Sequence, residues 1–257
     1  MISMVELPCR GQGAVRKLLS ALLLIASTSC ATPGTGQGPL EVASDLDNAP
    51  FAFVDGEGTP KGRDVEMMEE LASRLGRELV WVRMPFAELL PTVEEGRVDA
   101  VCATMGITPE RAERVSFTRP YYRTMIAVVV RSRPGEPRQL AELRGRSVSG
   151  AAGTTSERAI RQHLPGALLA VTDKDAPTWQ RLQSGEIDAA VCDGPAADAM
   201  VAASGGLLRR LEESLGGEDY ALVVPRGETT LREALDSELA ELEAEGWLAE
   251  LDARFGL

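Results

Sequence analysis

The alternation of short apolar runs with amphipathic helical patterns constrains this chain most strongly. From Leu40 onward, strand-like runs alternate with segments in which apolar residues recur every three or four positions. The expected strands are 40–44, 78–82 and 98–102, with helices at 64–75 and 86–95 between them, and after residue 140 the same order recurs with strands at 147–149, 168–171 and 188–191 and helices at 156–164, 178–184 and 196–203. This alternation predicts an α/β protein with mostly parallel sheets covered by helices.

A short sequence echo suggests that the two halves are alike. Residues 96–100 (GRVDA) and 185–189 (GEIDA) share the pattern Gly-x-[Val/Ile]-Asp-Ala, and each run continues through valine to a cysteine. Helix-glycine-strand punctuation also recurs by chance in α/β proteins, but the matching alternation around it favours two similar lobes. Ligands of such sheets bind beyond the carboxyl ends of the strands, which points to the residues just after Ser44, Cys102, Ser149 and Cys192.

The N-terminal residues have the pattern of a secretion signal. Arg10, Arg16 and Lys17 precede an apolar run at 18–26, followed by small residues up to Cys30. The run is about half the ~20 residues that a membrane-spanning helix needs, so residues 1–30 are expected to form a bacterial signal peptide. Its end resembles a lipobox in which Cys30 is lipidated, with plain cleavage nearby as the alternative. Residues 31–39 are expected to form a flexible tether. The mature protein is expected in the periplasm or otherwise outside the cytoplasm, and it would be anchored to the membrane if Cys30 is lipidated.

Charge and composition exclude several classes of function. The chain of 257 residues has 27 Lys+Arg against 39 Asp+Glu and a net charge of −12, which argues against nucleic-acid binding. One histidine excludes a multi-histidine metal site, and we expect no cofactor. Cys102 and Cys192 could pair in an oxidising compartment. Because they fall in different predicted lobes, we expect two buried free thiols instead.

An arginine and a glycine-rich turn follow two of the predicted strands. Thr108 suits a helix N-cap and Pro109 the first helical position, which leaves Arg111 in a first turn where positive charge is unfavourable. Arg111 either forms a surface ion pair with Glu110 or Glu113, or presents its guanidinium to a carboxylate in a cleft. Residues 150–156 (GAAGTTS) open a helix and would offer backbone N–H groups to an anion, or serve simply as a tight turn.

Acidic residues follow the other two strands. Asp193 could receive a cationic amine or cap the next helix, and the acidic turn after the first strand contains Asp45 and Asp47. Taken together, the strand ends offer donors for a carboxylate and acceptors for amines. A free α-amino acid is a zwitterion with those needs, and Asp45 and Asp47 favour a polar one whose side chain carries a hydrogen-bond donor.

Several segments resemble the family 3 extracellular solute-binding proteins, the amino-acid receptors of ABC importers. The resemblance covers 40–257 and lies in residues 42–55, 62–66, 107–111, 115–122, 152–155, 188–193 and 245–251. It implies a two-lobed type II periplasmic-binding-protein fold, the Venus flytrap, with two crossover strands. On this basis lobe 1 comprises 40–121 and 221–257, lobe 2 comprises 126–216, and the hinges lie near 122–125 and 217–220.

The resemblance also implies roles for individual residues. Arg111 would hold the ligand's α-carboxylate with help from the Thr155 backbone N–H, and Asp193 would hold the α-ammonium. The remaining implied site residues are Asp45 near the ligand side chain, Asn48 in place of a stacking aromatic, Phe86 as an aromatic cleft wall, Thr104 and Gly106 on the rim of the first lobe, Ala151 where larger or polar residues are common, and Thr154 beside Thr155. Arg63 replaces the usual Phe of a Gly-Phe-Asp motif.

The expected function is therefore a non-enzymatic, monomeric receptor that binds a free, polar L-amino acid and delivers it to a membrane permease. A ligand-sensing module of a signalling system is one alternative. The other is a cyclohexadienyl-dehydratase-like enzyme on the same scaffold. That enzyme is expected to have a glutamate three positions after Asp193, where this chain has Ala196.

Overall fold

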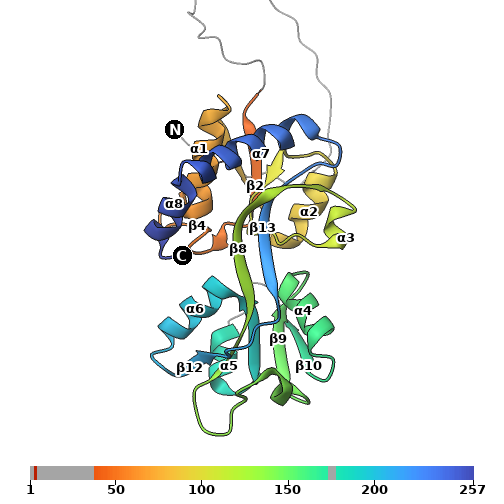
Figure 1. Cartoon of the computed structure of the whole chain (residues 1–257), viewed down its shortest axis with the longest axis vertical. Coiled ribbons are helices and arrows are strands. Elements are labelled where there is room, and N and C mark those ends of the chain that lie inside the picture. Colours follow the sequence, from red (N-terminus) through yellow and green to blue (C-terminus); the bar gives the residue numbers. More distant parts are fainter. Residues whose placement is uncertain (1–2, 5–37, 173–177) are drawn as a thin grey trace, which may run out of the picture.

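The computed structural model describes residues 3–4, 38–172 and 178–257. The predicted signal peptide, the lipidation at Cys30 and the tether therefore lie outside the described residues, apart from Ser3–Met4 and the last two tether positions. The chain folds into two lobes, one above the other in Figure 1, which are joined by two long strands. The two-lobed α/β fold predicted from the sequence is confirmed.

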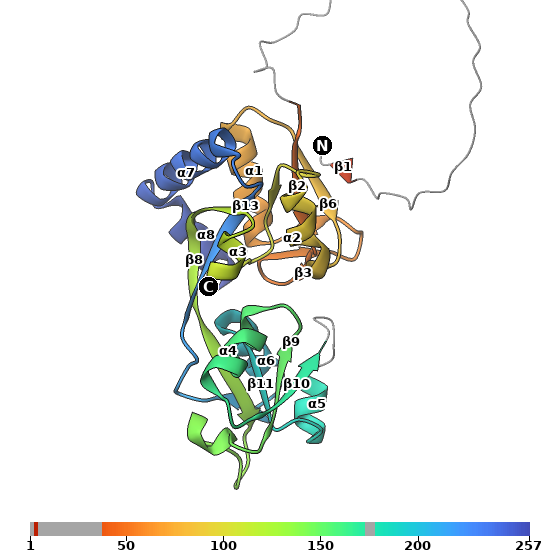
Figure 2. The same ribbon diagram turned by 90° about the vertical axis from the view of Figure 1, so that its right-hand side faces the viewer.

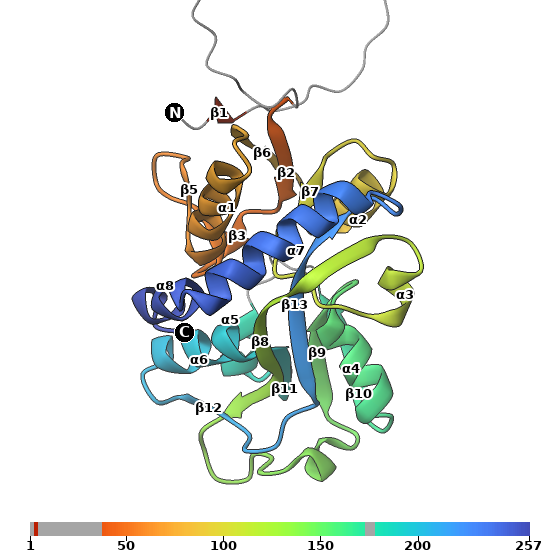
Figure 3. The same cartoon turned by 45° about the horizontal axis from the view of Figure 1, so that its top comes forward.

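The first lobe is built on a sheet whose strand order is β1-β6-β2-β7-β13-β8. Its parallel strands are β1 (Ser3–Met4), β2 (Leu40–Ser44), β6 (Leu79–Arg83) and β7 (Ala100–Val101). Its helices are α1 (Arg63–Arg74), α2 (Phe86–Glu94), α3 (Pro109–Ala112), α7 (Thr229–Ala244) and α8 (Trp247–Phe255), and a small antiparallel sheet is formed by β3 (Asp47–Asn48), β4 (Ala52–Val54) and β5 (Pro60–Lys61). The C-terminal helices α7 and α8 thus return to the lobe in which β2 begins (Figure 3).

The second lobe repeats the pattern on a smaller scale (Figure 2). Its parallel strands are β9 (Ser147–Ala151), β10 (Leu168–Thr172) and β11 (Ala189–Asp193), and β12 (Leu208–Arg210) pairs with β8 at the far side. Its helices are the 3-10 turn η1 (Leu140–Leu143) with α4 (Thr155–His163), α5 (Thr178–Ser184) and α6 (Gly194–Ala203). In each lobe the apolar core lies between the sheet and its helices.

The two lobes are connected by β8 (Ser116–Arg131), which runs through both sheets, and by β13 (Gly217–Val224), which pairs antiparallel with the first-lobe half of β8. Along this ladder Met125 is opposite Gly217 and Tyr122 is opposite Tyr220. The residues predicted as hinges therefore lie side by side in the crossover. The lobe and hinge boundaries themselves stay predictions.

The echoed Gly-x-[Val/Ile]-Asp-Ala runs have the same local structure in the two lobes. The Asp99 N–H donates to the Glu41 carbonyl (3.0 Å), and the Asp99 carboxylate accepts from the Glu41 N–H (3.0 Å). In the second lobe the Asp188 N–H donates to the Ser147 carbonyl (2.8 Å), and the Asp188 carboxylate accepts from the Ser147 N–H (3.0 Å). Each aspartate thus anchors the start of the neighbouring central strand, which is the physical reason for the repeated pattern.

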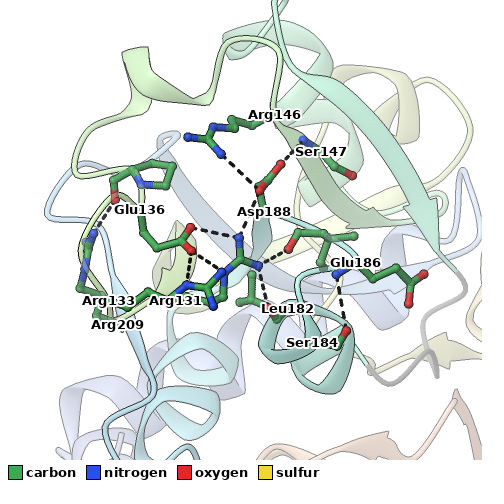
Figure 4. A network of polar contacts seen from close by, with 12 residues as sticks. Arg131, Arg133, Glu136, Arg146, Ser147, Leu182, Ser184, Glu186, Asp188 and Arg209 are labelled. Carbon is green, nitrogen blue, oxygen red and sulfur yellow. Dashed lines mark hydrogen bonds and ion pairs between the residues drawn. The ribbon is translucent and has the colours of Figure 1, made fainter.

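A buried arginine connects this anchor in the second lobe to its surroundings (Figure 4). Arg131 donates to both carboxylate oxygens of Glu136 (2.7 and 3.0 Å), to Asp188 (3.1 Å), and to the carbonyls of Leu182 (2.8 Å) and Ile187 (2.6 Å). Burial alone would raise the pKa of Glu136, but hydrogen bonds from Arg131 and Arg133 outweigh it and lower that pKa. The network ties β8, α5 and the start of β11 into one unit.

Cys102 and Cys192 are both free thiols and lie in different lobes, as predicted. Cys102 is buried as expected, whereas Cys192 is only half-buried, so the prediction of two buried thiols is wrong for Cys192. Burial raises the pKa of both thiols, so neither is a ready nucleophile. Within the described ranges, no helix has the length and apolar character that crossing a membrane requires.

Candidate functional site

A cavity of about 560 Å³ lies between the lobes and is lined by residues from both. The first lobe contributes residues that follow β2 and β7, and the second contributes residues at the ends of β9 and β11. Its lining residues are Asp47, Asn48, Phe86, Thr104, Gly106, Arg111, Ser149, Gly150, Ala151, Thr154, Thr155, Ser156, Thr172, Thr178, Trp179, Gln180, Val191, Cys192, Asp193, Ala196, Met200, Glu218 and Tyr220. The cavity therefore lies at the carboxyl edges of both sheets, where ligands of α/β folds bind.

All but one of the site residues predicted from the sequence line this cavity. They are Asn48, Phe86, Thr104, Gly106, Arg111, Ala151, Thr154, Thr155 and Asp193. Asp45 is different, because it is 5% exposed, directly follows β2 and is not part of the lining. Asp47, two residues further on, lines the cavity in the region where Asp45 was expected.

Arg111 is held by contacts with both lobes. Thr108 caps α3 as predicted, its hydroxyl accepting from the Arg111 N–H (3.2 Å). The guanidinium donates to the Gly106 carbonyl in the first lobe (2.7 Å) and to the Gly153 carbonyl in the second (3.1 Å). It also lies 5.8 Å from the centre of the Phe86 ring, a cation–π distance. Burial lowers the pKa of Arg111, but a guanidinium remains charged at neutral pH.

The sequence left open a surface ion pair between Arg111 and a neighbouring glutamate. In the structure, other contacts hold the Arg111 side chain. The neighbouring Glu110 pairs instead with Arg158 of α4 (2.7 Å). The Arg111 guanidinium is held by two backbone carbonyls and lies against an aromatic ring, and Arg111 lines the cavity. An anion brought into this cavity would meet a preoriented, planar donor.

The N-terminus of α4 faces the same cavity. Thr154 is its N-cap and Thr155 its first residue, and the Thr154 hydroxyl donates to the Ala151 carbonyl (2.7 Å). The glycine at 153 has a φ of 71°, which allows the chain to turn from β9 into the helix. The first-turn amides of a helix point out from its N-terminus and attract negative charge. The structure thus brings a helix start and Arg111 to one side of the cavity.

Asp193 both caps a helix and lines the cavity. Its Oδ1 accepts from the Ala196 N–H at 2.9 Å, which makes it the N-cap of α6. The sequence left open whether Asp193 caps the helix or faces the cleft. In the structure it does both, because it caps α6 and also lines the cavity.

Two predicted residues of the first lobe are linked at the rim. The Asn48 side-chain amide donates to the Thr104 hydroxyl (2.8 Å). Thr104 has a φ of 48°, a conformation that is strained for a β-branched side chain. Strained residues persist where the surrounding structure holds them and are typical of functional sites.

Sequence reasoning missed several residues of the cavity. Glu218 and Tyr220 come from the crossover strand β13, and Trp179 comes from α5, with 43% of its surface exposed. Burial raises the pKa of Glu218 to about 7; the Thr155 hydroxyl opposes that shift, and the charge of Asp193 adds to it. No motif signals these residues, because their orientation toward the cavity depends on how the lobes are joined.

Arg63 is not part of the cavity. It is fully buried in the first lobe, where it donates to Asp252 of α8 (2.8 Å), to Asp64 (3.2 Å) and to the Tyr121 carbonyl (3.2 Å). The replacement of the usual Phe by Arg63 is therefore a change in the core and not a charge presented to a ligand. Within the described part of the chain, no group of three or more His, Cys, Asp or Glu side chains is placed to hold a metal.

The family model of bacterial extracellular solute-binding proteins, family 3, matches residues 40–257. The chain belongs to this family. It is 27% identical over 258 residues to the histidine-binding periplasmic protein of Salmonella typhimurium, covering 94% of this chain and 97% of that one.

Solved structures agree with the family. An ancestral arginine-binding protein bound to arginine superposes with a TM-score of 0.78 and 29% identity, over 85% of this chain and 98% of that one. An ancestral amino-acid-binding protein, a precursor of cyclohexadienyl dehydratase, superposes with a TM-score of 0.76 and 27% identity, over 85% and 95% of the two chains. The relatives are thus amino-acid-binding proteins of the periplasmic type.

Proposed function

We propose that this chain is an extracytoplasmic receptor that binds a free, polar L-amino acid between its lobes and delivers it to the permease of an ABC importer. One observation carries the proposal: a single cavity places the Arg111 guanidinium and the α4 N-terminus together and includes the Asp193 carboxylate. A zwitterion needs donors for its carboxylate and an acceptor for its ammonium. The relatives' ligands, histidine and arginine, support the same class of ligand.

The ligand is placed by its charged ends. Its α-carboxylate would bind the Arg111 fork and the Thr155 backbone N–H, and its α-ammonium would bind Asp193. The side chain would then extend toward Asp47 and Trp179, which also line the cavity. An acid and an indole ring suit a side chain with N–H donors or positive charge, because carboxylates accept hydrogen bonds and aromatic faces attract cations.

We infer binding without catalysis. A dehydratase of this fold is expected to have an acid three positions after the ammonium-binding aspartate. Here that position is Ala196, which lines the cavity with a methyl group that cannot transfer a proton. The signal peptide and the Cys30 anchor stay predictions, and they agree with the extracellular family to which the chain belongs.

A thermal-shift screen of the standard L-amino acids tests the proposal. A ligand at about 100 times its dissociation constant adds roughly 2.7 kcal/mol of stability, which raises the melting temperature by several degrees. We expect a basic or polar amino acid to do this. Its decarboxylated amine and its carboxamide serve as matched controls, and they should have little effect because each lacks the carboxylate for Arg111. If no amino acid raised the melting temperature, the proposal would be wrong.

A further inference from the structure

Glu218 lies beside the donors that the proposed function assigns to the ligand's carboxylate. It is the second residue of β13, where the crossover ladder pairs it with Thr124 of β8. Its carboxyl group lines the interlobe cavity together with Arg111 and Asp193. Its Oε1 accepts a hydrogen bond from the Thr155 hydroxyl at 2.5 Å. A carboxyl group of the protein thus already contacts the residue whose backbone N–H would receive the ligand.

The loop at Gly106 is shaped to admit this carboxyl group. A Cβ at position 106 would lie 2.3 Å from Glu218 Oε1 and 2.9 Å from the Thr155 methyl group. The backbone of Gly106 does not have a positive φ, so glycine is needed here for space and not for conformation. Gly106 and Glu218 therefore fit each other, and a side chain at position 106 would require the Glu218 carboxyl group to shift.

The charged and titratable groups around Glu218 come from several elements. Within the cavity these are the Arg111 guanidinium of α3, the Asp193 carboxylate at the end of β11, and the Tyr220 hydroxyl on its own strand. On the other side of Glu218, Arg158 and His163 of α4 line a second cavity.

The other charges near this position are engaged elsewhere. Asp219, the next residue, pairs with Arg123 of β8 (3.1 Å), and Arg158 pairs with Glu110 (2.7 Å). Burial has the largest effect on the pKa of Glu218 and raises it to about 7. The hydrogen bond from the Thr155 hydroxyl lowers this pKa, the negative charge of Asp193 raises it, and the positive charge of Arg111 lowers it.

Two ionised carboxylates that share the same hydrogen-bond donors repel each other, and this repulsion favours the neutral form of one of them. When the ligand's carboxylate reaches Arg111 and Thr155, the neighbouring Glu218 must either leave or become neutral. A neutral Glu218 carries an O–H that can donate to the ligand's carboxylate, which turns a repulsive contact into a hydrogen bond.

We propose that Glu218 is a further ligand-binding residue of the cleft, which contacts the ligand's carboxylate as a neutral acid, so that binding takes up one proton. The inference rests on the proposed function. The proton comes from solvent, protonates the Glu218 carboxylate, and returns to solvent when the ligand leaves.

The sign of the pH dependence follows from this arrangement. In the free protein the pKa of Glu218 is about 7. The ligand's negative carboxylate raises it further, so Glu218 is protonated in the complex over a wider range of pH. Below about pH 6 it is protonated in both states, and affinity does not depend on it. Above about pH 7 binding must first protonate it, so affinity falls by up to about tenfold per pH unit.

The test is calorimetric titration at about pH 6 and about pH 8, in buffers of different ionisation heat, with each standard L-amino acid that stabilises the protein in a thermal-shift screen. For the wild-type protein we expect roughly tenfold weaker binding at the higher pH and uptake of close to one proton there. Glu218→Gln keeps a donor without titrating, so its affinity should be the same at both pH values. Asp219→Asn, the exposed neighbour, is the matched control and should keep the wild-type pH dependence.

The outcomes separate the two proposals. Wild-type binding that is independent of pH, or that strengthens at high pH, would overturn the role of Glu218, since the second result would place it at the ammonium. Glu218→Gln binding more weakly at both pH values would also overturn it. In each of these cases an amino acid still binds, and the proposed function stands. If no amino acid binds the wild-type protein at either pH, the proposed function fails and this inference fails with it.

Discussion

The Asp193 carboxylate has two tasks that need different properties of the side chain. Capping α6 requires an acceptor for the Ala196 N–H, which an asparagine oxygen supplies as well as an aspartate oxygen does. Binding an ammonium group requires negative charge, which asparagine lacks. Substitution can therefore separate the structural task from the binding task.

Asp193→Asn should leave the free energy of unfolding close to wild type and reduce amino-acid affinity. The loss of a charged hydrogen bond costs about 1.5–3 kcal/mol, or roughly 10- to 150-fold in affinity. Asp193→Ala should lose the same affinity and, in addition, about 1 kcal/mol of stability with the cap. Urea denaturation and calorimetric titration measure the two effects. Asp198→Asn, in the same helix and paired with Arg210, is the control. Wild-type affinity in Asp193→Asn would remove Asp193 from the ammonium site.

Single residues could be predicted where their position is fixed locally. Asp193 lies two residues past the predicted strand 188–191, and Arg111 lies in the first turn of the helix that follows the predicted strand 98–102. The strand-end rule for α/β sheets places such segments at the cleft. Glu218 lies on a crossover strand, and whether it faces the cleft depends on the pairing of β13 with β8. Asp45 shows the limit of the rule, because it is buried just outside the cavity while Asp47 lines it.

Among the elements, α1 and α8 are joined by one buried and one exposed ion pair. Arg63 of α1 reaches Asp252 of α8 from a fully buried position, and its guanidinium also contacts the buried Asp64. Arg254 of α8 reaches back to Glu66 of α1 (2.8 Å) on the surface. Burial alone would lower the pKa of Arg63, but Asp64 and Asp252 raise it, so the arginine remains charged.

Arg63→Met should lower the free energy of unfolding by about 3–5 kcal/mol, because it leaves Asp64 buried without its cationic partner. Arg254→Ala connects the same two helices and should cost less than about 1 kcal/mol, because its ion pair is in water. Chemical denaturation of both variants gives the comparison. Equal effects of the two substitutions would show that burial of Arg63 does not determine the stability of this contact.

Most helices and strands could be predicted to within a residue or two, because hydrophobic period and glycine punctuation are local signals. The observed α1 (Arg63–Arg74) is shifted by one residue from the predicted 64–75. The strand predicted at 98–102 is shorter, since β7 covers only Ala100–Val101. The Asp99 N–H donates to the Glu41 carbonyl, and the Asp99 carboxylate accepts from the Glu41 N–H. Asp99 thus anchors the start of β2 just before the pairing of β2 with β7 begins at Ala100. Composition alone does not indicate such an anchor, although the repeated Gly-x-[Val/Ile]-Asp-Ala pattern does.

For the whole molecule, the contacts that cross the cleft converge on one region. Arg111 reaches the Gly153 carbonyl, Glu110 pairs with Arg158, and Glu218 accepts from Thr155. All three join the start of α4 to the first lobe or to the crossover. The sequence predicts each lobe from its own periodicity, but the way in which they face each other depends on the two crossover strands and is not a local property.

Arg111 is the residue at which the account can be tested most directly, because it contacts both lobes and would hold the ligand. Its guanidinium is oriented by the Gly106 and Gly153 carbonyls, and Arg111 lines the interlobe cavity. Arg114, a few residues on, is the matched control, since it pairs with Glu94 at the surface and does not line the cavity.

The measurement is calorimetric titration of the wild-type protein, Arg111→Ala, Arg111→Lys and Arg114→Ala with the amino acid that stabilises the protein most. Arg111→Ala should cost about 2–5 kcal/mol, or roughly 30- to 4,000-fold in affinity, because it leaves the ligand's carboxylate unpaired. Arg111→Lys should also weaken binding, since an ammonium group lacks the planar two-donor fork. Arg114→Ala should bind like the wild type. An Arg111→Ala protein that folds normally and binds within about fivefold of wild type, a difference of about 1 kcal/mol, would contradict the account.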